Sequence, residues 1–182
     1  MDKWVLITGG TKGIGRAVAN CLAKAGYQLI LTYASDTKAA EATCTTLRQA
    51  HGVRVELLRA DITDPRAVDE INAFLRGAER RLDALVLNAG ITCRDPFEQI
   101  QPADWLRVFQ ANVHFPVFLL QRIVDLLNEK GSVVFTGSLM GIEPHSVSLA
   151  YGVTKSAVHA LVKNLVKFMA PYGLRVNAVA PG

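Results

Sequence analysis

The sequence is poor in cysteine and in long apolar runs, and each shortage excludes a class of protein. Its three cysteines, Cys21, Cys44 and Cys93, are far apart and form no CxxC pair. This spacing predicts neither a disulfide framework nor a metal site, and reduced thiols are the simpler interpretation. No apolar run reaches the roughly 18 residues that cross a bilayer, and the chain enters a strand-like run at Trp4 without a leader pattern. We therefore expect a soluble, cytoplasmic protein that does not bind membranes.

The sequence also has no large excess of charge of either sign. The formal net charge of +4 is spread along the chain, without basic blocks or interleaved aromatic residues, which argues against a nucleic-acid-binding surface. No repeat and no low-complexity segment is visible. Half of the residues are hydrophobic, enough for one compact core, so we expect a single domain over residues 1–182.

Short apolar runs rich in branched residues alternate with longer segments of helical period. This alternation is typical of an α/β fold in which a doubly wound parallel sheet lies between two layers of helices. The predicted strands are 4–8, 28–33, 54–59, 84–88, 132–136 and 175–179, and the predicted helices are 14–24, 38–50, 65–77, 102–127 and 148–170.

Proline and glycine mark several of the predicted helix ends. Pro65 and Pro102 stand where first helical turns should begin. Gly26, Gly52 and Gly131 stand where helices should stop.

A glycine-rich turn joins the first predicted strand to the first helix. Gly9, Gly13 and Gly15 have the spacing GxxxGxG. Glycine permits the tight turn and lets the backbone approach a pyrophosphate, while free amides at the helix start supply donors. Because the turn follows a strand and precedes an amphipathic helix, it predicts a dinucleotide site rather than an ordinary turn.

The end of the second predicted strand bears on which dinucleotide binds. An acidic residue there would bind the ribose hydroxyls and repel a 2′-phosphate. The position falls at Tyr33, and Ser35 follows shortly; Asp36 lies farther into the loop. Lys12 can pair with a phosphate monoester, although a solvated turn lysine is the alternative. NADP(H) is therefore favoured, and NAD(H) remains open.

Tyr151 and Lys155 are four residues apart on a predicted helix, so their side chains share one face. A phenol is a weak acid at neutral pH, and an adjacent cation stabilises its phenolate. The pair predicts a proton donor, although a YxxxK pattern alone more often marks a core tyrosine beside a surface lysine.

Three further polar sites strengthen the catalytic interpretation. Ser138 follows the fifth predicted strand, at the edge where open parallel sheets bind ligands. The segment 88–90, Asn-Ala-Gly, follows the fourth strand. Asn112 lies inside a predicted helix, an unfavourable place for asparagine unless its amide meets a specific partner.

Together these motifs resemble the short-chain dehydrogenase/reductase family along essentially the whole chain. Residues 8–15 look like its TGxxxGxG turn, 88–90 like its NAG motif and 175–182 like its PG segment. The resemblance implies a Rossmann-type fold with strand order 3-2-1-4-5-6. The family's usual last strand and substrate lid have no counterpart here, so we expect the chain to be part of a longer enzyme.

The resemblance also implies roles for individual residues. Asn112, Ser138, Tyr151 and Lys155 match the family's catalytic tetrad: Tyr151 exchanges the substrate proton, Lys155 also binds the nicotinamide ribose, Ser138 orients the carbonyl and Asn112 holds a water. Asp61 resembles the residue that contacts adenine. The implied cofactor-binding set is Gly9, Thr11, Lys12, Gly13, Ile14, Gly15, Tyr33, Ser35, Asp61, Ile62, Asn88, Ala89, Gly90, Tyr151, Lys155, Pro181 and Gly182.

A subgroup resemblance narrows the expected function. Residues 88–92 followed by Arg94 and Asp95 are similar to the 3-oxoacyl-[acyl-carrier-protein] reductases of fatty-acid biosynthesis, whereas Phe115 replaces a frequent glycine of that group. We expect an NADP(H)-dependent oxidoreductase that reduces a ketone, with a nucleotide-binding module without turnover as the alternative. The helix 148–170 is apolar nearly all round, which favours a homodimer or homotetramer.

Overall fold

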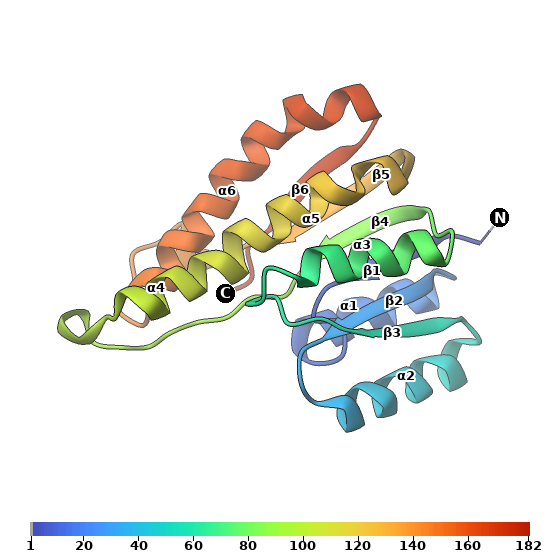
Figure 1. The fold of residues 1–182 in the computed structure, drawn as a ribbon, viewed down its shortest axis with the longest axis horizontal. Helices are drawn as coiled ribbons and strands as arrows, with labels where there is room; N and C mark the ends of the chain where they lie inside the picture. The colour runs from blue at the N-terminus through green and yellow to red at the C-terminus, as the bar shows by residue number, and fades with distance from the viewer. Residues whose placement is uncertain (1) are drawn as a thin grey trace.

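The computed structural model describes residues 2–182, and its centre is a six-stranded parallel sheet (Figure 1). The strand order is β3-β2-β1-β4-β5-β6, and every neighbouring pair is parallel. This confirms the predicted Rossmann-type topology. The strands are β1 (Trp4–Ile7), β2 (Gln28–Tyr33), β3 (Val55–Arg59), β4 (Leu82–Leu87), β5 (Leu127–Thr136) and β6 (Arg175–Val179).

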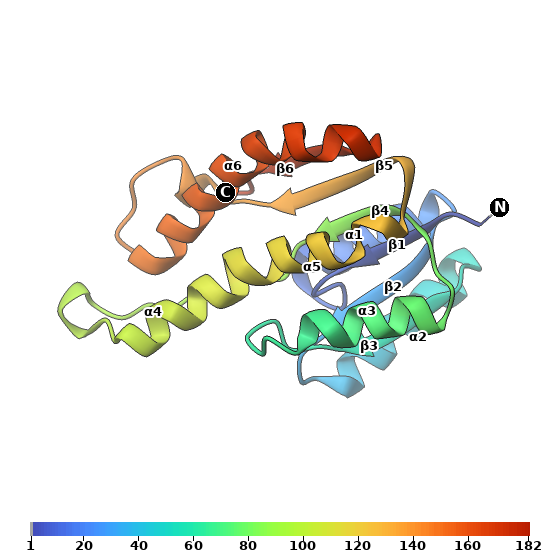
Figure 2. The same ribbon diagram turned by 45° about the horizontal axis from the view of Figure 1, so that its top comes forward.

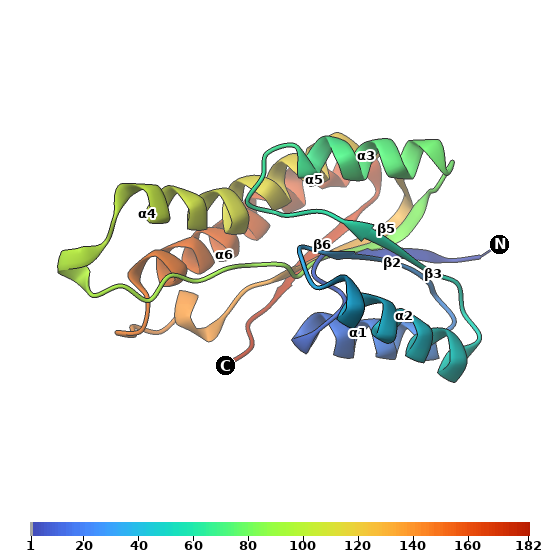
Figure 3. The ribbon, with the colours of Figure 1, turned by 60° about the horizontal axis from the view of Figure 1, so that its bottom comes forward.

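Helices cover the sheet on both faces (Figure 3). The helices α1 and α2 pack on one face of the β1–β3 half, and α3, α5 and α6 pack on the other face. Figure 2 shows α4 and α5 following one another as a long arm beside α6. The helices are α1 (Gly13–Lys24), α2 (Thr37–His51), α3 (Ala67–Gly77), α4 (Pro102–Phe109), α5 (Phe115–Ile123) and α6 (Leu149–Met169).

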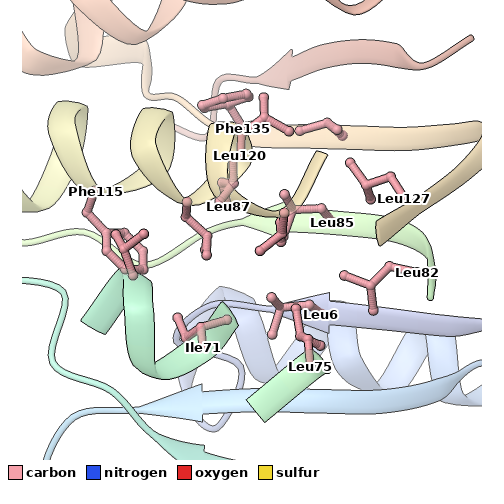
Figure 4. Close-up of a cluster of buried hydrophobic side chains, with 14 of the residues drawn as sticks. Leu6, Ile71, Leu75, Leu82, Leu85, Leu87, Phe115, Leu120, Leu127 and Phe135 are labelled. Atoms are coloured by element: carbon pink, nitrogen blue, oxygen red, sulfur yellow. The ribbon is translucent and has the colours of Figure 1, made fainter. Parts of the chain in front are cut away.

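Two apolar cores lie on the two faces of the sheet. The larger one joins strand residues such as Leu85 and Phe135 to Ile71 of α3 and Phe115 of α5, and all four are almost fully buried (Figure 4). Side chains of alternating strand positions fill the smaller core with residues of α1 and α2. Burying each large apolar side chain contributes roughly 1.5–3 kcal/mol, so the strands are held from both sides.

The predicted helix 102–127 is wrong as a single helix. It is broken by a π-helical segment, Gln110–His114, between α4 and α5, and α5 ends at Ile123. A π-helical turn carries one extra residue, which costs regular hydrogen bonding and is common at functional sites. Asn112 lies inside this segment.

Two of the residues predicted to mark helix ends do not do so. Helix α3 begins at Ala67 rather than at Pro65. Gly131 does not end a helix, because it lies within β5, next to Lys130, whose φ of 66° marks an irregular stretch of that strand. Gly26 and Gly52 do follow α1 and α2, with φ of 85° and 67°.

The topology places one edge of the sheet ready for a ligand. From β1 the chain crosses to β2 on one side, whereas β4 lies on the other side of β1. The loops after β1 and β4 therefore diverge and leave a crevice at the carboxyl ends of the strands. Within residues 2–182, none of the helices combines the length and the apolar character needed to span a bilayer.

Candidate active site

A cleft runs across the carboxyl ends of the strands and consists of two adjoining hollows that share Gly90 and Ile91. One hollow, of about 300 Å³, lies over β1, β2 and β3, and the other, of about 410 Å³, lies over β4, β5 and the start of α6. A long ligand with two dissimilar ends fits this arrangement.

The glycine turn is built so that side chains are excluded from it. Gly9 and Gly13 have φ of 62° and 53°, which favours glycine. A Cβ on Gly15 would lie 2.2 Å from the backbone oxygen of Gly9. The start of α1 can therefore pack closely against the glycine-rich loop only because residue 15 is glycine.

The start of α1 leaves its amides free. Lys12 is the N-cap residue, and its side chain makes no capping hydrogen bond. No acidic side chain lies in the first turn of the helix. The unpaired N–H groups and the helix dipole therefore favour an anion, and a pyrophosphate matches both.

Asn88 ties the loop after β4 to this turn. Its side-chain amide donates to the carbonyl oxygens of Thr8 and Gly9, at 3.0 and 3.3 Å, and its backbone N–H donates to the Thr8 hydroxyl at 3.0 Å. The Gly9 N–H in turn donates to the Thr32 hydroxyl at 3.1 Å. These bonds fix the floor of the cleft between the two hollows.

The first hollow ends at the loop after β2, where Tyr33 and Ser35 line it. Asp36 also lines it, and its carboxylate accepts the Ala39 N–H at 3.0 Å as the cap of α2. Arg59 donates through Nε to the Ala34 carbonyl at 3.1 Å, so a guanidinium lies beside the same loop.

Asp61 has a structural task within the first hollow. Its carboxylate accepts from the backbone N–H and the hydroxyl of Thr63, at 2.9 and 2.8 Å. Ile62, which is buried, and Asp61 both line the hollow. An aromatic ring held there would meet an apolar side chain and a fixed polar edge.

Of the predicted catalytic pair, Tyr151 lines the second hollow and Lys155 lies buried behind it. Tyr151 is half-buried, and the Lys155 ammonium lies 5.4 Å from the centre of the Tyr151 ring. Lys155 is 4% exposed, and its Nζ donates to the Thr136 carbonyl at 2.6 Å. The two side chains share one face of α6, as the four-residue spacing predicts.

The Lys155 ammonium has no carboxylate partner among residues 2–182. Burial penalises its charge and lowers its pKa from 10.5 to about 8. At neutral pH it is still a cation, placed behind the phenol and screened little by water. This position lets it stabilise negative charge on the Tyr151 oxygen.

Ser138 is the third member of this end of the cleft. It is buried, lines the second hollow and accepts the Met140 N–H at 3.2 Å through Oγ. Its own N–H points at Nε2 of His159, 3.4 Å away. Burial first, then Lys155 and Lys163, lower the pKa of His159, which favours the neutral imidazole that can accept this bond.

Asn112 lies buried beneath the cleft and links two of the segments that form it. Its oxygen accepts the Ile91 N–H at 2.9 Å, and its amide nitrogen donates to the Ile91 carbonyl at 2.9 Å and to the Thr154 hydroxyl at 3.0 Å. The expectation that its amide meets specific partners is thereby confirmed. The side chain joins the loop after β4 to α6, which carries Tyr151.

The comparison with known families decides the class. The sequence profile of the short chain dehydrogenases matches residues 3–182. The chain belongs to the short-chain dehydrogenase/reductase family. It is therefore an oxidoreductase by family.

Individual relatives of this dehydrogenase agree with that assignment. Sulfoacetaldehyde reductase 2 of Chromohalobacter salexigens is 36% identical over all of the chain and 73% of its own length. The 3-oxoacyl-[acyl-carrier-protein] reductase of Staphylococcus aureus is 32% identical, again over all of the chain and 74% of its own length. A short chain dehydrogenase from Burkholderia cenocepacia, solved in complex with NADP, superposes with a TM-score of 0.92 at 31% identity, covering 99% of this chain and 74% of that one.

The structure brings most of the predicted site residues of this dehydrogenase to the cleft. Gly15, Asn112 and Lys155 are buried beneath its surface, where they shape the turn or support their neighbours. Gly13 is exposed and lies outside the lining of both hollows. The roles of all four residues in binding and catalysis stay predictions. The predicted residues that line the hollows are Gly9, Thr11, Lys12, Ile14, Tyr33, Ser35, Asp61, Ile62, Asn88, Ala89, Gly90, Ser138, Tyr151, Pro181 and Gly182.

Several residues that support the site of the dehydrogenase could not be predicted from the sequence. Thr136 and Thr154 bind Lys155 and Asn112, but a threonine in a strand or a helix carries no distinctive signal. His159 contacts the turn of Ser138, and it belongs to none of the motifs in the sequence. Its position one helical turn after Lys155 was the only available sign.

Proposed function

We propose that this chain is an NADP(H)-dependent carbonyl reductase that converts a ketone to a secondary alcohol, and that residues 1–182 act as one catalytic domain. The observation that carries the proposal is the placement of Tyr151 and Ser138 in one hollow that continues into a glycine-turn nucleotide cradle, with the buried Lys155 ammonium 5.4 Å from the centre of the Tyr151 ring. A donor of hydride and a donor of protons would then face the same carbonyl.

The chain's own residues account for the proton and for orientation. The Tyr151 hydroxyl donates a proton to the carbonyl oxygen as the alcohol forms, and the Lys155 cation 5.4 Å from its ring centre stabilises the resulting phenolate. Ser138 Oγ holds the carbonyl oxygen by a hydrogen bond. The hydrogen bonds of Asn112 hold α6 against the loop after β4. A water bound beside Asn112 would return a proton to Tyr151. NADPH, when bound, supplies the hydride.

The residues of the cradle fit such a dinucleotide. The free amides of α1 suit the pyrophosphate, and the turn accepts it because no Cβ fits at Gly15. Lys12 and the guanidinium of Arg59 supply positive charge near the ribose end, although Asp36 also lines this hollow. A structural neighbour bound to NADP supports the same cofactor.

Replacing Lys12 with glutamine tests the choice between the two cofactors. A charge-assisted hydrogen bond to a 2′-phosphate contributes roughly 1.5–3 kcal/mol, so Lys12→Gln should raise the Kd for NADPH about tenfold or more. The Kd for NADH should change less than about twofold, because NADH lacks that phosphate. Fluorescence titration measures both values. Lys24→Gln, at the other end of α1, is the matched control, and an equal loss for both cofactors contradicts the assignment.

The substrate is proposed as a small carbonyl compound, with a 3-oxoacyl thioester as the more specific alternative. The 3-oxoacyl-[acyl-carrier-protein] reductase among the relatives supports the thioester and a place in fatty-acid biosynthesis in the cytoplasm, with an acyl-carrier protein as partner. The sulfoacetaldehyde reductase supports a small aldehyde or ketone. Both names describe reduction of a carbonyl group.

A cofactor-oxidation assay tests the proposed reaction. Loss of NADPH absorbance should follow addition of a member of a ketone and aldehyde panel, and the product should be the corresponding alcohol. Binding of NADPH without turnover of any member would instead favour a nucleotide-binding module. Failure to bind either cofactor would overturn both assignments.

Exposed apolar side chains support a homodimer or homotetramer. Leu106 and Phe118 on the α4–α5 arm are 65% and 51% exposed, and Val166 and Phe168 of α6 are 51% and 69% exposed. Neighbouring helices that keep such residues in water commonly mark a subunit interface. Sedimentation at micromolar concentration tests this, and a stable monomer contradicts it.

A further inference from the structure

Arg94 is the charged side chain that lines the second hollow of the cleft. It lies on the loop after β4, four residues beyond Gly90, in the same hollow as Tyr151 and Ser138. The remaining walls are apolar, hydroxyl-bearing or glycine: Ile14, Gly90, Ile91, Thr92, Thr136, Gly137, Met140, Val147, Ser148, Pro181 and Gly182.

The Arg94 guanidinium is uncommitted. Within residues 2–182 it takes part in no ion pair, and it is exposed to solvent. Its neighbour Asp95 accepts from the Cys93 thiol. Glu143, on the opposite loop, does not line the hollow.

The charge that lines this hollow is therefore positive. Arg94 stands at its wall, the unpaired Lys155 ammonium lies behind Tyr151, and no carboxylate lines it. A neutral substrate can form no ion pair with an unpaired guanidinium, whereas a carboxylate, sulfonate or phosphate can accept two parallel charge-assisted hydrogen bonds from it. The volume of about 410 Å³ is at the small end for ligand pockets.

From these observations we propose that the substrate is a small oxo acid, a carbonyl compound whose anionic group is bound by Arg94 while its carbonyl faces Tyr151 and Ser138. The inference rests on the proposed carbonyl reduction and adds the charge of the substrate to it. Arg94 binds the distant end of the substrate, takes no part in the proton transfer and so determines specificity.

Pairs of substrates that differ only in charge test the inference. We would compare 3-oxobutanoate and 4-oxopentanoate, each with its methyl ester, and 2-oxopropanesulfonate with its methyl sulfone analogue. A charge-assisted pair contributes roughly 1.5–3 kcal/mol. The anionic member of the preferred pair should therefore have a kcat/KM at least about tenfold above that of its neutral partner.

Variants of Arg94 separate its charge from its bulk. Arg94→Met should lower kcat/KM for the anionic substrate about tenfold to a hundredfold, through KM, and leave the neutral partner within about twofold. Arg94→Lys should recover part of the loss. Arg175→Met, at the amino end of β6 and away from the cleft, removes the same charge as a matched control and should change neither value.

Binding provides a readout that is independent of turnover. Calorimetric titration of the chain with its cofactor present should detect butyrate more readily than butyramide, which has the same shape without the charge. Arg94→Met should abolish this preference, while the Kd of the cofactor stays the same.

The possible outcomes distinguish the two proposals. Turnover that favours the neutral members, or an Arg94→Met loss equal for both members of a pair, overturns the anion site and leaves carbonyl reduction intact. An acetoacetyl thioester of pantetheine reduced better than every oxo acid also overturns it. Absence of turnover on all carbonyl compounds overturns carbonyl reduction, and the substrate inference with it.

Discussion

Tyr151→Phe should lower kcat for carbonyl reduction by about 10²-fold to 10⁴-fold, the range that a positioned proton donor contributes. The variant removes one oxygen and keeps the ring. The ring remains against the Lys155 ammonium, so the packing of α6 does not change. The NADPH Kd and the melting temperature should therefore stay close to those of the parent protein. Single-turnover measurements of cofactor oxidation report the chemical step directly.

An exposed tyrosine supplies the control for this experiment. Tyr172 is 49% exposed and lies beyond the end of α6, so Tyr172→Phe should leave kcat unchanged. Retention of full kcat by Tyr151→Phe would remove the phenol from the mechanism. Water or another hydroxyl of the hollow, such as that of Ser138, would then have to donate the proton.

Most of the fold could be predicted from local patterns. Most strands are short branched-rich runs whose core-facing positions, such as Leu6 and Ile30, are fully buried. The exception is β5, which begins at Leu127, five residues before its predicted start. Parallel strands joined by helices have few permitted arrangements, because crossover connections are right-handed and short. The order of the six strands could thus be inferred once the family resemblance was recognised, and the structure has that order.

The break in the α4–α5 arm could not be predicted in the same way. The segment Gln110–His114 contains neither proline nor glycine, so nothing within it interrupts a regular helix. The π-helical turn is accompanied by bonds from Asn112 to Ile91 and Thr154, which are 21 and 42 residues away in sequence. Only the asparagine itself, unusual in a helix interior, signalled that a tertiary contact existed.

The candidate site shows the same division. Its glycine turn and its YxxxK pair are each contained in one short segment, so their geometry follows from the spacing. Whether Arg94 and Lys155 form ion pairs depends on which residues face them across the cleft. The spacing of residues in the sequence does not show that no carboxylate pairs with either side chain.

The unpaired burial of Lys155 gives the second large expected effect. Lys155→Met should abolish measurable turnover and yet stabilise the chain in the absence of ligand. At pH 7 the lysine is charged in both folded and unfolded chains, and its pKa falls from 10.5 to about 8 on burial. Keeping that charge buried therefore costs up to roughly 3 kcal/mol. Loss of the hydrogen bond to the Thr136 carbonyl offsets about half of the gain.

The net effect on the melting temperature is a rise of about 3–6 °C at pH 7, measurable by calorimetry. The pH dependence of this stabilisation has a defined sign. Between about pH 8 and 10.5 the unfolded chain binds more protons at position 155 than the folded chain does. The parent protein therefore gains stability as the pH rises. The advantage of Lys155→Met should therefore be complete below pH 8 and shrink toward pH 10.5. Lys163→Met, two turns along the same helix and exposed, should show neither effect. A Lys155→Met protein that melts below its parent at pH 7 would mean that the contacts of the ammonium outweigh its burial, and that this site is not held at the expense of stability.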